Sequence, residues 1–227
     1  MEFIAGAGIF LWKETLLQAA PFEGEAVAVA NVLGRLHSAS TAGYFDRAPF
    51  DNAADFDQLR LDPYLRFTAG RHPVLAAPMQ AMAEALLQSR IALIHGDVSP
   101  KNILLRDGQP IFLDAECATM GDPAFDVAFC LNHLLLKSYH MPAHAARLRS
   151  EAAAFWGEYA ARVTWEPATR IEARVAALLP MLMLARIDGK SPVEYLDEAT
   201  RGRVREAAVP LIATPAPDLA SFMNQLT

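Results

Sequence analysis

The chain has 227 residues, of which 53% are hydrophobic and 20% are charged. This length and composition fit one large folded domain, or one domain with an appendage, and exclude an intrinsically disordered chain. The formal net charge of −6 argues against nucleic acid or an anionic membrane as the main partner, whereas it would suit a cationic substrate.

The sequence contains neither a disulfide framework nor a membrane-targeting segment. Its two cysteines, Cys117 and Cys130, lie in apolar stretches, and we expect them to be small core residues rather than ligands. Residues 1–11 lack the basic start of a secretory signal, and the apolar run at 176–185 is too short to span a bilayer. We therefore expect a cytoplasmic protein without membrane contact.

Hydrophobic periodicity predicts a mainly α-helical domain with a small β insert. Residues 1–17 are expected to form a short extended piece that leads into a helix, and His37 is expected to be a partly buried residue at the end of a second helix. Three short apolar runs predict strands at 91–94, 103–105 and 111–113, with a hairpin turn at 106–109. Helices are expected at 25–38, 50–67, 73–89, 124–138, 143–163, 169–186, 198–209 and 218–226.

The loop and strands of this β insert carry the residues with the clearest chemistry. Residues 95–102 read HGDVSPKN, and a second aspartate, Asp114, ends the third strand. Asp97, on a loop after a strand, is expected to reach solvent or substrate, where it can orient a hydroxyl and accept its proton. Asn102 and Asp114 offer an amide and a carboxylate oxygen, which suit Mg²⁺. We expect His95 to orient the loop by hydrogen bonding and Lys101 to be a solvated loop charge.

Residues 95–102 resemble the catalytic loop of the aminoglycoside phosphotransferase and choline kinase superfamily, the protein-kinase-like small-molecule kinases. Residues 113–127, LDAECATMGDPAFDV, are similar to the segment that follows that loop in the family. Residues 11–13, 59–64 and 185–192 also resemble family segments, so the resemblance covers essentially the whole chain as a C-terminal lobe. It implies a kinase-like fold and transfer of the γ-phosphate of ATP to a hydroxyl of a small molecule.

The resemblance also implies a role for each polar residue of this segment. Asp97 would be the catalytic aspartate, and Asn102 and Asp114 would hold Mg²⁺ and the ATP phosphates. Glu116 could reach a second metal ion or an amine of the substrate. Asp126 would cap a helix and hold the backbone of the catalytic loop in place, which is a structural role.

The resemblance divides the chain into a hinge-like segment, residues 1–12, and a helical lobe, residues 13–227. The backbone groups of Glu2 and Phe3 would meet the adenine of ATP. Complete members of the family also have an N-terminal β-rich lobe with a phosphate-binding lysine, and no segment of this sequence resembles that lobe. Because loss of that lysine would raise the barrier by about 4 kcal/mol or more, we expect the chain alone to be a weak or inactive kinase.

Two kinds of partner follow from this expectation. An N-terminal lobe could be supplied in trans, or the chain could self-associate through an apolar face that a missing lobe leaves partly bare, which would include Phe3, Ile4, Ile9, Phe10 and Trp12. The alternative function is a lobe that binds a ligand or partner without turnover. The acceptor remains open among aminoglycosides, choline-like alcohols, sugars and amino-alcohols.

Overall fold

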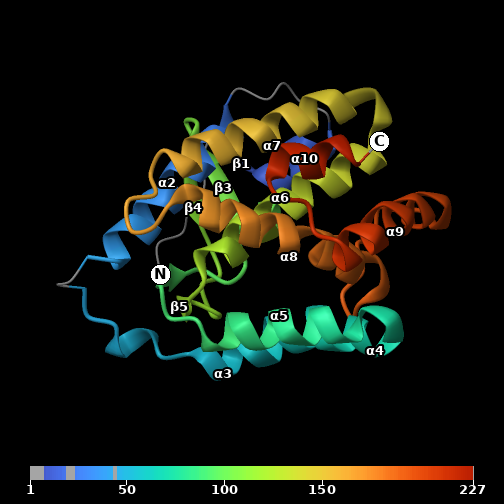
Figure 1. Ribbon diagram of the computed structural model, residues 1–227. Helices are drawn as coiled ribbons and strands as arrows, with labels where there is room; N and C mark the ends of the chain where they lie inside the picture. The colour runs from blue at the N-terminus through green and yellow to red at the C-terminus, as the bar shows by residue number, and fades with distance from the viewer. Residues whose placement is uncertain (1–7, 19–23, 43–44, 227) are drawn as a thin grey trace.

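The structure is a computed structural model that describes residues 8–18, 24–42 and 45–226 of the chain. Helices dominate it, and two small antiparallel sheets lie on one side of the helical layer (Figure 1). The expected fold class, mainly α with a small β insert, agrees with this architecture. Both cysteines are buried free thiols, as expected, and burial raises the pKa of the Cys117 thiol to about 11.

One almost completely buried helix, α6 (Pro123–His140), forms the centre of the helical layer. It packs against α7 (Ala145–Ala160) and α8 (Ala168–Asp188). Helix α2 (Glu25–Ser40) packs on α7, and α9 (Glu198–Ala213) packs on α8, with the short helix α10 (Leu219–Asn224) beside α7 and α8. The apolar periodicity predicted all of these helices to within a few residues, because the outer helices bury an apolar stripe of side chains, whereas α6 is buried on nearly all sides.

The first sheet pairs β3 (Ile103–Arg106) with β4 (Gln109–Phe112) and, on its other edge, with β1 (Ile9–Leu11). The predicted hairpin is confirmed, and Asp107 and Gly108 take positive φ angles of 53° and 74° at its tip. The second sheet pairs β2 (Ala92–Ile94) with β5 (Thr119–Gly121). Strand β5 was not predicted, because its sequence Thr-Met-Gly carries no alternating apolar pattern.

The segment between α2 and β2 folds as a helical layer of its own, seen along the lower edge of Figure 1. A helical run extends from α3 (Ala53–Phe56) through a π-helical stretch (Asp57–Arg66) into α4 (Phe67–Arg71). It packs against α5 (Ala76–Gln88), which follows a 3₁₀ turn (Pro73–Leu75). The expected helix at 50–67 therefore begins later and runs further than predicted, and Pro63 lies inside its wide turns.

The described part of the hinge-like segment belongs to the first sheet and the helix that follows it. Trp12 begins α1 (Trp12–Leu17) and is completely buried in the core, so the expectation that it would be partly bare is wrong. Ile9 and Phe10 are half-buried. Residues 1–7, including Glu2, Phe3 and Ile4, lie outside the described part, and the boundary at residue 12 stays a prediction.

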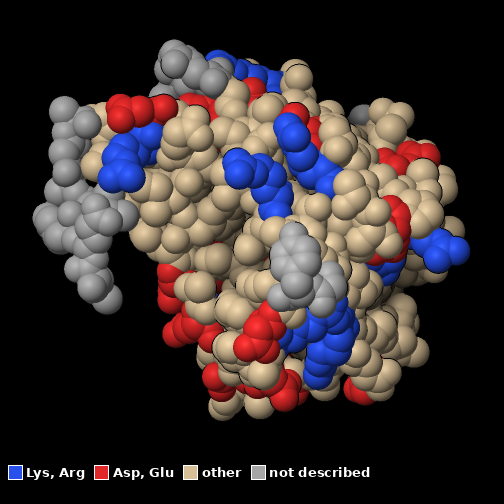
Figure 2. All heavy atoms as spheres, turned by 90° about the vertical axis from the view of Figure 1, so that its left-hand side faces the viewer, with Lys and Arg blue, Asp and Glu red and all other residues tan. Residues whose placement is uncertain are grey.

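The surface carries charges of both signs. Figure 2 shows acidic side chains along the lower part of one face, at the level of α3 and α5, and Lys and Arg side chains across its middle. Among the described residues, no helix has the length and apolar composition that a membrane crossing requires.

Candidate active site

The loop between β2 and β3 is fixed by a buried carboxylate on α6. Asp126 is completely buried, and its Oδ2 accepts from the backbone N–H of His95 at 2.7 Å while its Oδ1 accepts from that of Gly96 at 2.9 Å. Charge-assisted bonds of this kind are the strong ones in a low-dielectric interior. The contact matches the loop-holding role expected for Asp126. The expected helix cap is wrong, because Asp122 is the N-cap of α6 and accepts from Ala124 N at 2.9 Å.

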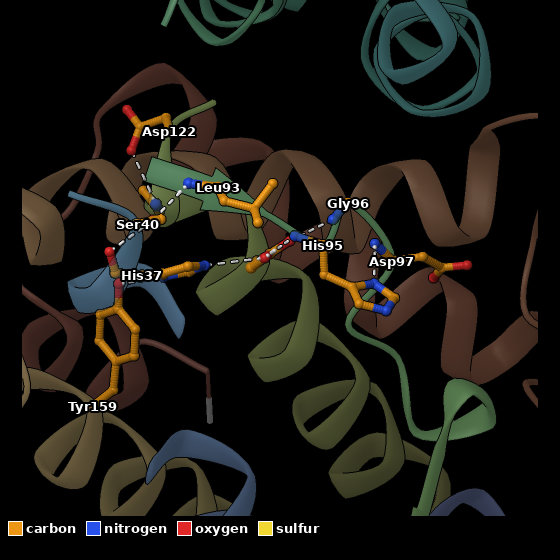
Figure 3. A network of polar contacts seen from close by, with 10 residues as sticks. His37, Ser40, Leu93, His95, Gly96, Asp97, Asp122 and Tyr159 are labelled. Carbon is orange, nitrogen blue, oxygen red and sulfur yellow. Dashed lines mark hydrogen bonds and ion pairs between the residues drawn. The ribbon is translucent and has the colours of Figure 1, made fainter. Parts of the chain in front are cut away.

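A second layer of buried groups supports Asp126 from α2 and α7. His37 Nε2 lies 3.2 Å from Asp126 Oδ2. On the other side of the ring, His37 Nδ1 lies 2.9 Å from the Tyr159 hydroxyl (Figure 3). Burial and the charge of Asp126 raise the pKa of Tyr159 well above its usual value, so its hydroxyl keeps its proton and can donate to Nδ1. His37 is completely buried, which corrects the expectation of a partly buried residue at a helix end.

Gly96 allows the loop to pass close to the segment after β4. Its φ is +80°, and a Cβ added there would lie 2.8 Å from both the Cβ and the carbonyl oxygen of Cys117. Any other residue would combine an unfavourable left-handed backbone with a steric clash against backbone atoms. His95 completes the loop, because its Nδ1 accepts from the N–H of Asp97 at 3.3 Å, a contact that supports the orienting role expected for it.

The carboxylate of Asp97 lies among positive charges. Its Oδ2 accepts from Arg60 Nη2 at 2.8 Å and lies 3.2 Å from Lys101 Nζ, whereas its Oδ1 has no partner among the described residues. The side chain is only 3% exposed, so Asp97 is far less open to solvent than expected. Lys101 is exposed, as expected for a solvated loop charge, and it also pairs with Asp97, which the sequence did not predict.

Arg60 comes from the π-helical stretch and contacts the loop at two points. Besides its bond to Asp97, its Nε donates to the carbonyl oxygen of Gly96 at 2.7 Å. The pair of side chains is nearly buried, with 10% of Arg60 and 3% of Asp97 exposed. Arg60 therefore fixes the direction of the Asp97 carboxylate relative to the loop backbone, and we describe it as a positioning residue.

Replacing Arg60 with methionine should lower the free energy of unfolding by about 2 kcal/mol. Breaking one partner of a buried ion pair costs about 3–5 kcal/mol, and Lys101 still compensates part of the charge of Asp97. The matched control is Arg66→Met in the same helix, because Arg66 pairs with the partly exposed Asp57, and a surface pair contributes less than about 1 kcal/mol. Denaturant titrations measure both changes. Equal losses for the two variants would contradict the positioning role.

The two expected metal ligands meet at the open end of the β3–β4 hairpin. Asn102 precedes β3, its side-chain amide donates to the carbonyl oxygen of Asp97 at 3.3 Å, and its own carbonyl accepts from Leu113 N at 2.8 Å. Asp114 follows Leu113 directly, is exposed, and has no hydrogen bond or ion pair with any described residue. The structure thus brings Asp97, Asn102 and Asp114 together through backbone and side-chain bonds.

The backbone of Asp114 is itself unusual. Its φ of 63° places it, with Asp107, among the non-glycine residues that take a positive φ in the described part of the chain. Such conformations cost on the order of 1–3 kcal/mol and persist where the surrounding structure enforces them, often at functional sites. The residue in this conformation carries an exposed carboxylate that has no hydrogen bond or ion pair with any described residue, so it is free to bind an external cation.

The donor atoms at this end of the hairpin fit Mg²⁺. The Asn102 Oδ1 and the Asp114 carboxylate are hard oxygen ligands, and Mg²⁺ takes one or two such protein ligands with phosphate oxygens and water. Among the described residues, no three His, Cys, Asp or Glu side chains gather in a set that could hold a metal by themselves. A site of this kind would therefore depend on the phosphates of a bound nucleotide.

Glu116, a further expected site residue, is not joined to this cluster by a hydrogen bond or ion pair among the described residues. The side chain of Glu116 is exposed and makes no hydrogen bond or ion pair with a described residue, while its carbonyl oxygen accepts from Asn52 at 2.8 Å. The role expected for Glu116 stays a prediction. Glu2 and Phe3 lie outside the described residues, so their expected contact with adenine also stays a prediction.

Three residues that contact the site had no signal in the sequence as single residues. Arg60 lies in a polar helix where an arginine is ordinary, and His37 and Tyr159 are more than a hundred residues apart along the chain. Only the tertiary packing of the helices brings these three residues close to the loop. The one usable signal for Arg60 was its place in the family-like segment 59–64.

The fold and the site together define a mainly helical lobe in which a loop carrying a buried carboxylate lies beside a short β-hairpin. Residues 3–165 match the model of the phosphotransferase enzyme family, APH, and the chain belongs to this family. Comparison with curated protein sequences gives no significant match.

Three solved structures are similar to this chain at low sequence identity, and the first of them shares its fold. Amicoumacin kinase hAmiN, solved in complex with AMP-PNP, Ca²⁺ and Ami, is 19% identical with a TM-score of 0.54; the match covers 89% of this chain and 62% of that one. The choline kinase LicA from Streptococcus pneumoniae is 15% identical, with a TM-score of 0.43 and coverage of 92% and 68%. A glucosamine kinase is 16% identical, with a TM-score of 0.40 and coverage of 96% and 53%. This chain therefore spans about three fifths of the length of the amicoumacin kinase.

Proposed function

We propose that this chain is the phosphate-transfer lobe of an ATP-dependent kinase that acts on a hydroxyl of a small molecule. The observation that carries the proposal is the connected set Asp97, Asn102 and Asp114, in which hydrogen bonds join Asn102 to the backbone of Asp97 and to Leu113, the residue before Asp114. Membership of the phosphotransferase family supports the same reaction class. ATP and Mg²⁺ are the proposed cofactors, and an N-terminal lobe in trans or a second copy of the chain is a possible partner.

The proposed reaction uses the two oxygens of Asp97 differently. Oδ2 is held by Arg60 and Lys101, so Oδ1 remains to orient the acceptor hydroxyl and accept its proton. The hydroxyl oxygen forms a bond to the γ-phosphorus, the bond from that phosphorus to the bridging oxygen breaks, and ADP leaves. Asn102 and Asp114 would hold Mg²⁺, which when bound neutralises charge on the phosphates.

One observation favours the alternative function, binding without turnover. The Asp97 carboxylate is nearly buried, and its Oδ2 is already engaged by two cations, Arg60 and Lys101. A lobe of this kind could keep a nucleotide or an alcohol in place without transferring phosphate. Binding and turnover must therefore be measured separately.

Mg²⁺-ATP at about 100 times its Kd should stabilise the chain by about 2.7 kcal/mol, a rise of about 5–10 °C in the thermal midpoint. Asp114→Asn should abolish this rise, because it removes the charged ligand while asparagine tolerates the left-handed backbone. Chelating Mg²⁺ with EDTA should abolish it as well. Thermal unfolding with and without nucleotide measures all three effects.

The matched control is Asp107→Asn at the tip of the same hairpin. Asp107 also takes a positive φ, so the substitution makes the same chemical change in the same backbone conformation, away from the loop. It should leave the Mg²⁺-ATP shift unchanged. A shift that survives Asp114→Asn, or one that both variants lose equally, would count against the proposed metal site.

A further inference from the structure

A second polar site lies beside the catalytic loop, on the far side of Lys101. It is a cavity of about 80 Å³ between α1, the loop, α6 and the end of α8. The volume suffices for a group the size of a carboxylate or phosphate, since a single water needs only about 10–15 Å³ by the same kind of measure. Neither Asn102 nor Asp114 lines this cavity.

Positive charge dominates the walls of the cavity. Four cations line it, Lys13, Lys101, Lys137 and Arg186, against one carboxylate, Glu194. Lys13 pairs with Glu194 at 2.6 Å, and Lys101 pairs with Asp97 at 3.2 Å. The cavity therefore has an excess of positive charge in a chain whose overall formal charge is −6.

Two of these cations have no carboxylate partner among the described residues. Arg186 donates to the hydroxyl of Tyr64 at 3.3 Å and to the carbonyl oxygen of Ser191. Lys137 is 1% exposed, and its Nζ has only the carbonyl oxygen of His133 at 3.5 Å and the face of the Tyr195 ring at 5.3 Å. A buried ammonium without an anionic partner is costly, and a bound anion would offset that cost.

The neutral groups of the cavity are also suited to an anion. The Tyr195 hydroxyl is buried without a hydrogen-bond partner, and burial raises the pKa of this phenol, so it remains a donor. Burial, with Lys13 nearby, lowers the pKa of Lys137 to about 7. An anion in the cavity would favour the charged ammonium and restore a higher value.

We propose that this cavity binds an anionic group of the acceptor, a carboxylate or a phosphate, while the acceptor hydroxyl lies at Asp97. The inference rests on the proposed function and names its substrate class: a hydroxy acid or a phosphorylated alcohol rather than an amino-alcohol. Lys101 provides the link, because it lines the cavity and contacts the Asp97 carboxylate. A cationic acceptor would be repelled from the same walls.

Binding of simple anions to the full chain tests the cavity without any need for turnover. Isothermal titration with inorganic phosphate and with D-glycerate, in the absence of nucleotide, should show millimolar or tighter binding. Lys137→Met should weaken both at least tenfold, and Arg186→Met should do the same if the first variant folds poorly. The matched control is Lys190→Met, because Lys190 pairs with Asp62 on the surface outside the cavity and should leave binding unchanged within twofold.

The outcomes separate this inference from the proposed function. No anion binding, or equal binding by the wild-type chain and by the Lys137 and Arg186 variants, overturns the inference. Displacement of phosphate by Mg²⁺-ATP would assign the cavity to the nucleotide and also overturns it. Anion binding that depends on Lys137 supports the cavity even if ATP is never consumed, which would count against the proposed function alone.

A turnover measurement tests which charge the acceptor carries. ATP consumption is compared with D-glycerate, glycerol and ethanolamine, which present a hydroxyl with negative, neutral and positive charge. Preference for D-glycerate, lost in Lys137→Met, supports the inference. Preference for ethanolamine would support the proposed kinase activity but contradict the inference that the acceptor is anionic.

Discussion

Replacing Asp126 with alanine should lower the free energy of unfolding by about 5 kcal/mol, because several buried donors lose their acceptor and each costs about 1–3 kcal/mol. The backbone N–H groups of His95 and Gly96 and the ring of His37 all bond this carboxylate. Alanine would leave them unsatisfied inside the protein, where water cannot replace the lost bonds. Denaturant unfolding at neutral pH measures the loss.

Asp55→Ala is the control for this variant, because Asp55 is an exposed carboxylate in α3 and has no partner among the described residues. Its free energy of unfolding should stay within about 0.5 kcal/mol of the wild type. If Asp126→Ala also proved mild, the loop would have other means of holding its backbone. The buried contacts of His37 and Tyr159 would then not be needed to hold the loop.

Gly96→Ala should cost about 3 kcal/mol of stability, from a left-handed backbone worth about 1–2 kcal/mol and from overpacking worth about 1–3 kcal/mol. The new methyl group would lie 2.8 Å from the Cβ and carbonyl oxygen of Cys117, and the backbone oxygen there has little freedom to move. The loop would have to shift, which would also carry Asp97 away from Arg60. Unfolding measurements and the Mg²⁺-ATP thermal shift together report on stability and on the site.

Gly202→Ala adds the same methyl group but is expected to change the stability in the opposite direction. Gly202 lies inside α9, has no positive φ, and a Cβ there would have nothing within 4 Å. The substitution should raise stability by about 1 kcal/mol, because alanine is the better helix former. A Gly96→Ala variant that loses no more than about 0.5 kcal/mol would show that the close approach at Cys117 is relaxed in solution.

Local patterns predicted the parts of the fold that local physics determines. The helices follow from apolar residues at helical spacing, and the β3–β4 hairpin follows from Asp107-Gly108 between two apolar runs. The candidate site followed from the spacing of Asp97, Asn102 and Asp114 around that hairpin. A short turn makes the two strands antiparallel, so the residues just before β3 and just after β4 lie close together. The roles of these residues remain proposals.

The remaining parts depend on contacts between distant segments. His37 and Asp126 are 89 residues apart, and Arg60 and Asp97 are 37 apart, so no periodicity in the sequence connects them. The basic cavity has the same character, since Lys13, Lys137 and Arg186 come from three separate helices. The acidic overall composition would suit a cationic substrate, whereas the described fold gathers cations beside the loop.

The wide helical turns around Pro63 affect the direction in which Arg60 points relative to the loop. Phe67 N donates to the carbonyl oxygen of Asp62, so each turn there spans one residue more than in an ordinary α-helix. Because the rotation per residue is smaller, the direction of Arg60 depends on how many residues the wide stretch contains. Deleting one residue near Pro63 would turn Arg60 away from Gly96 without changing any side chain at the loop. The number of residues in this stretch therefore determines how Arg60 is directed toward the loop, and a point substitution does not change that number.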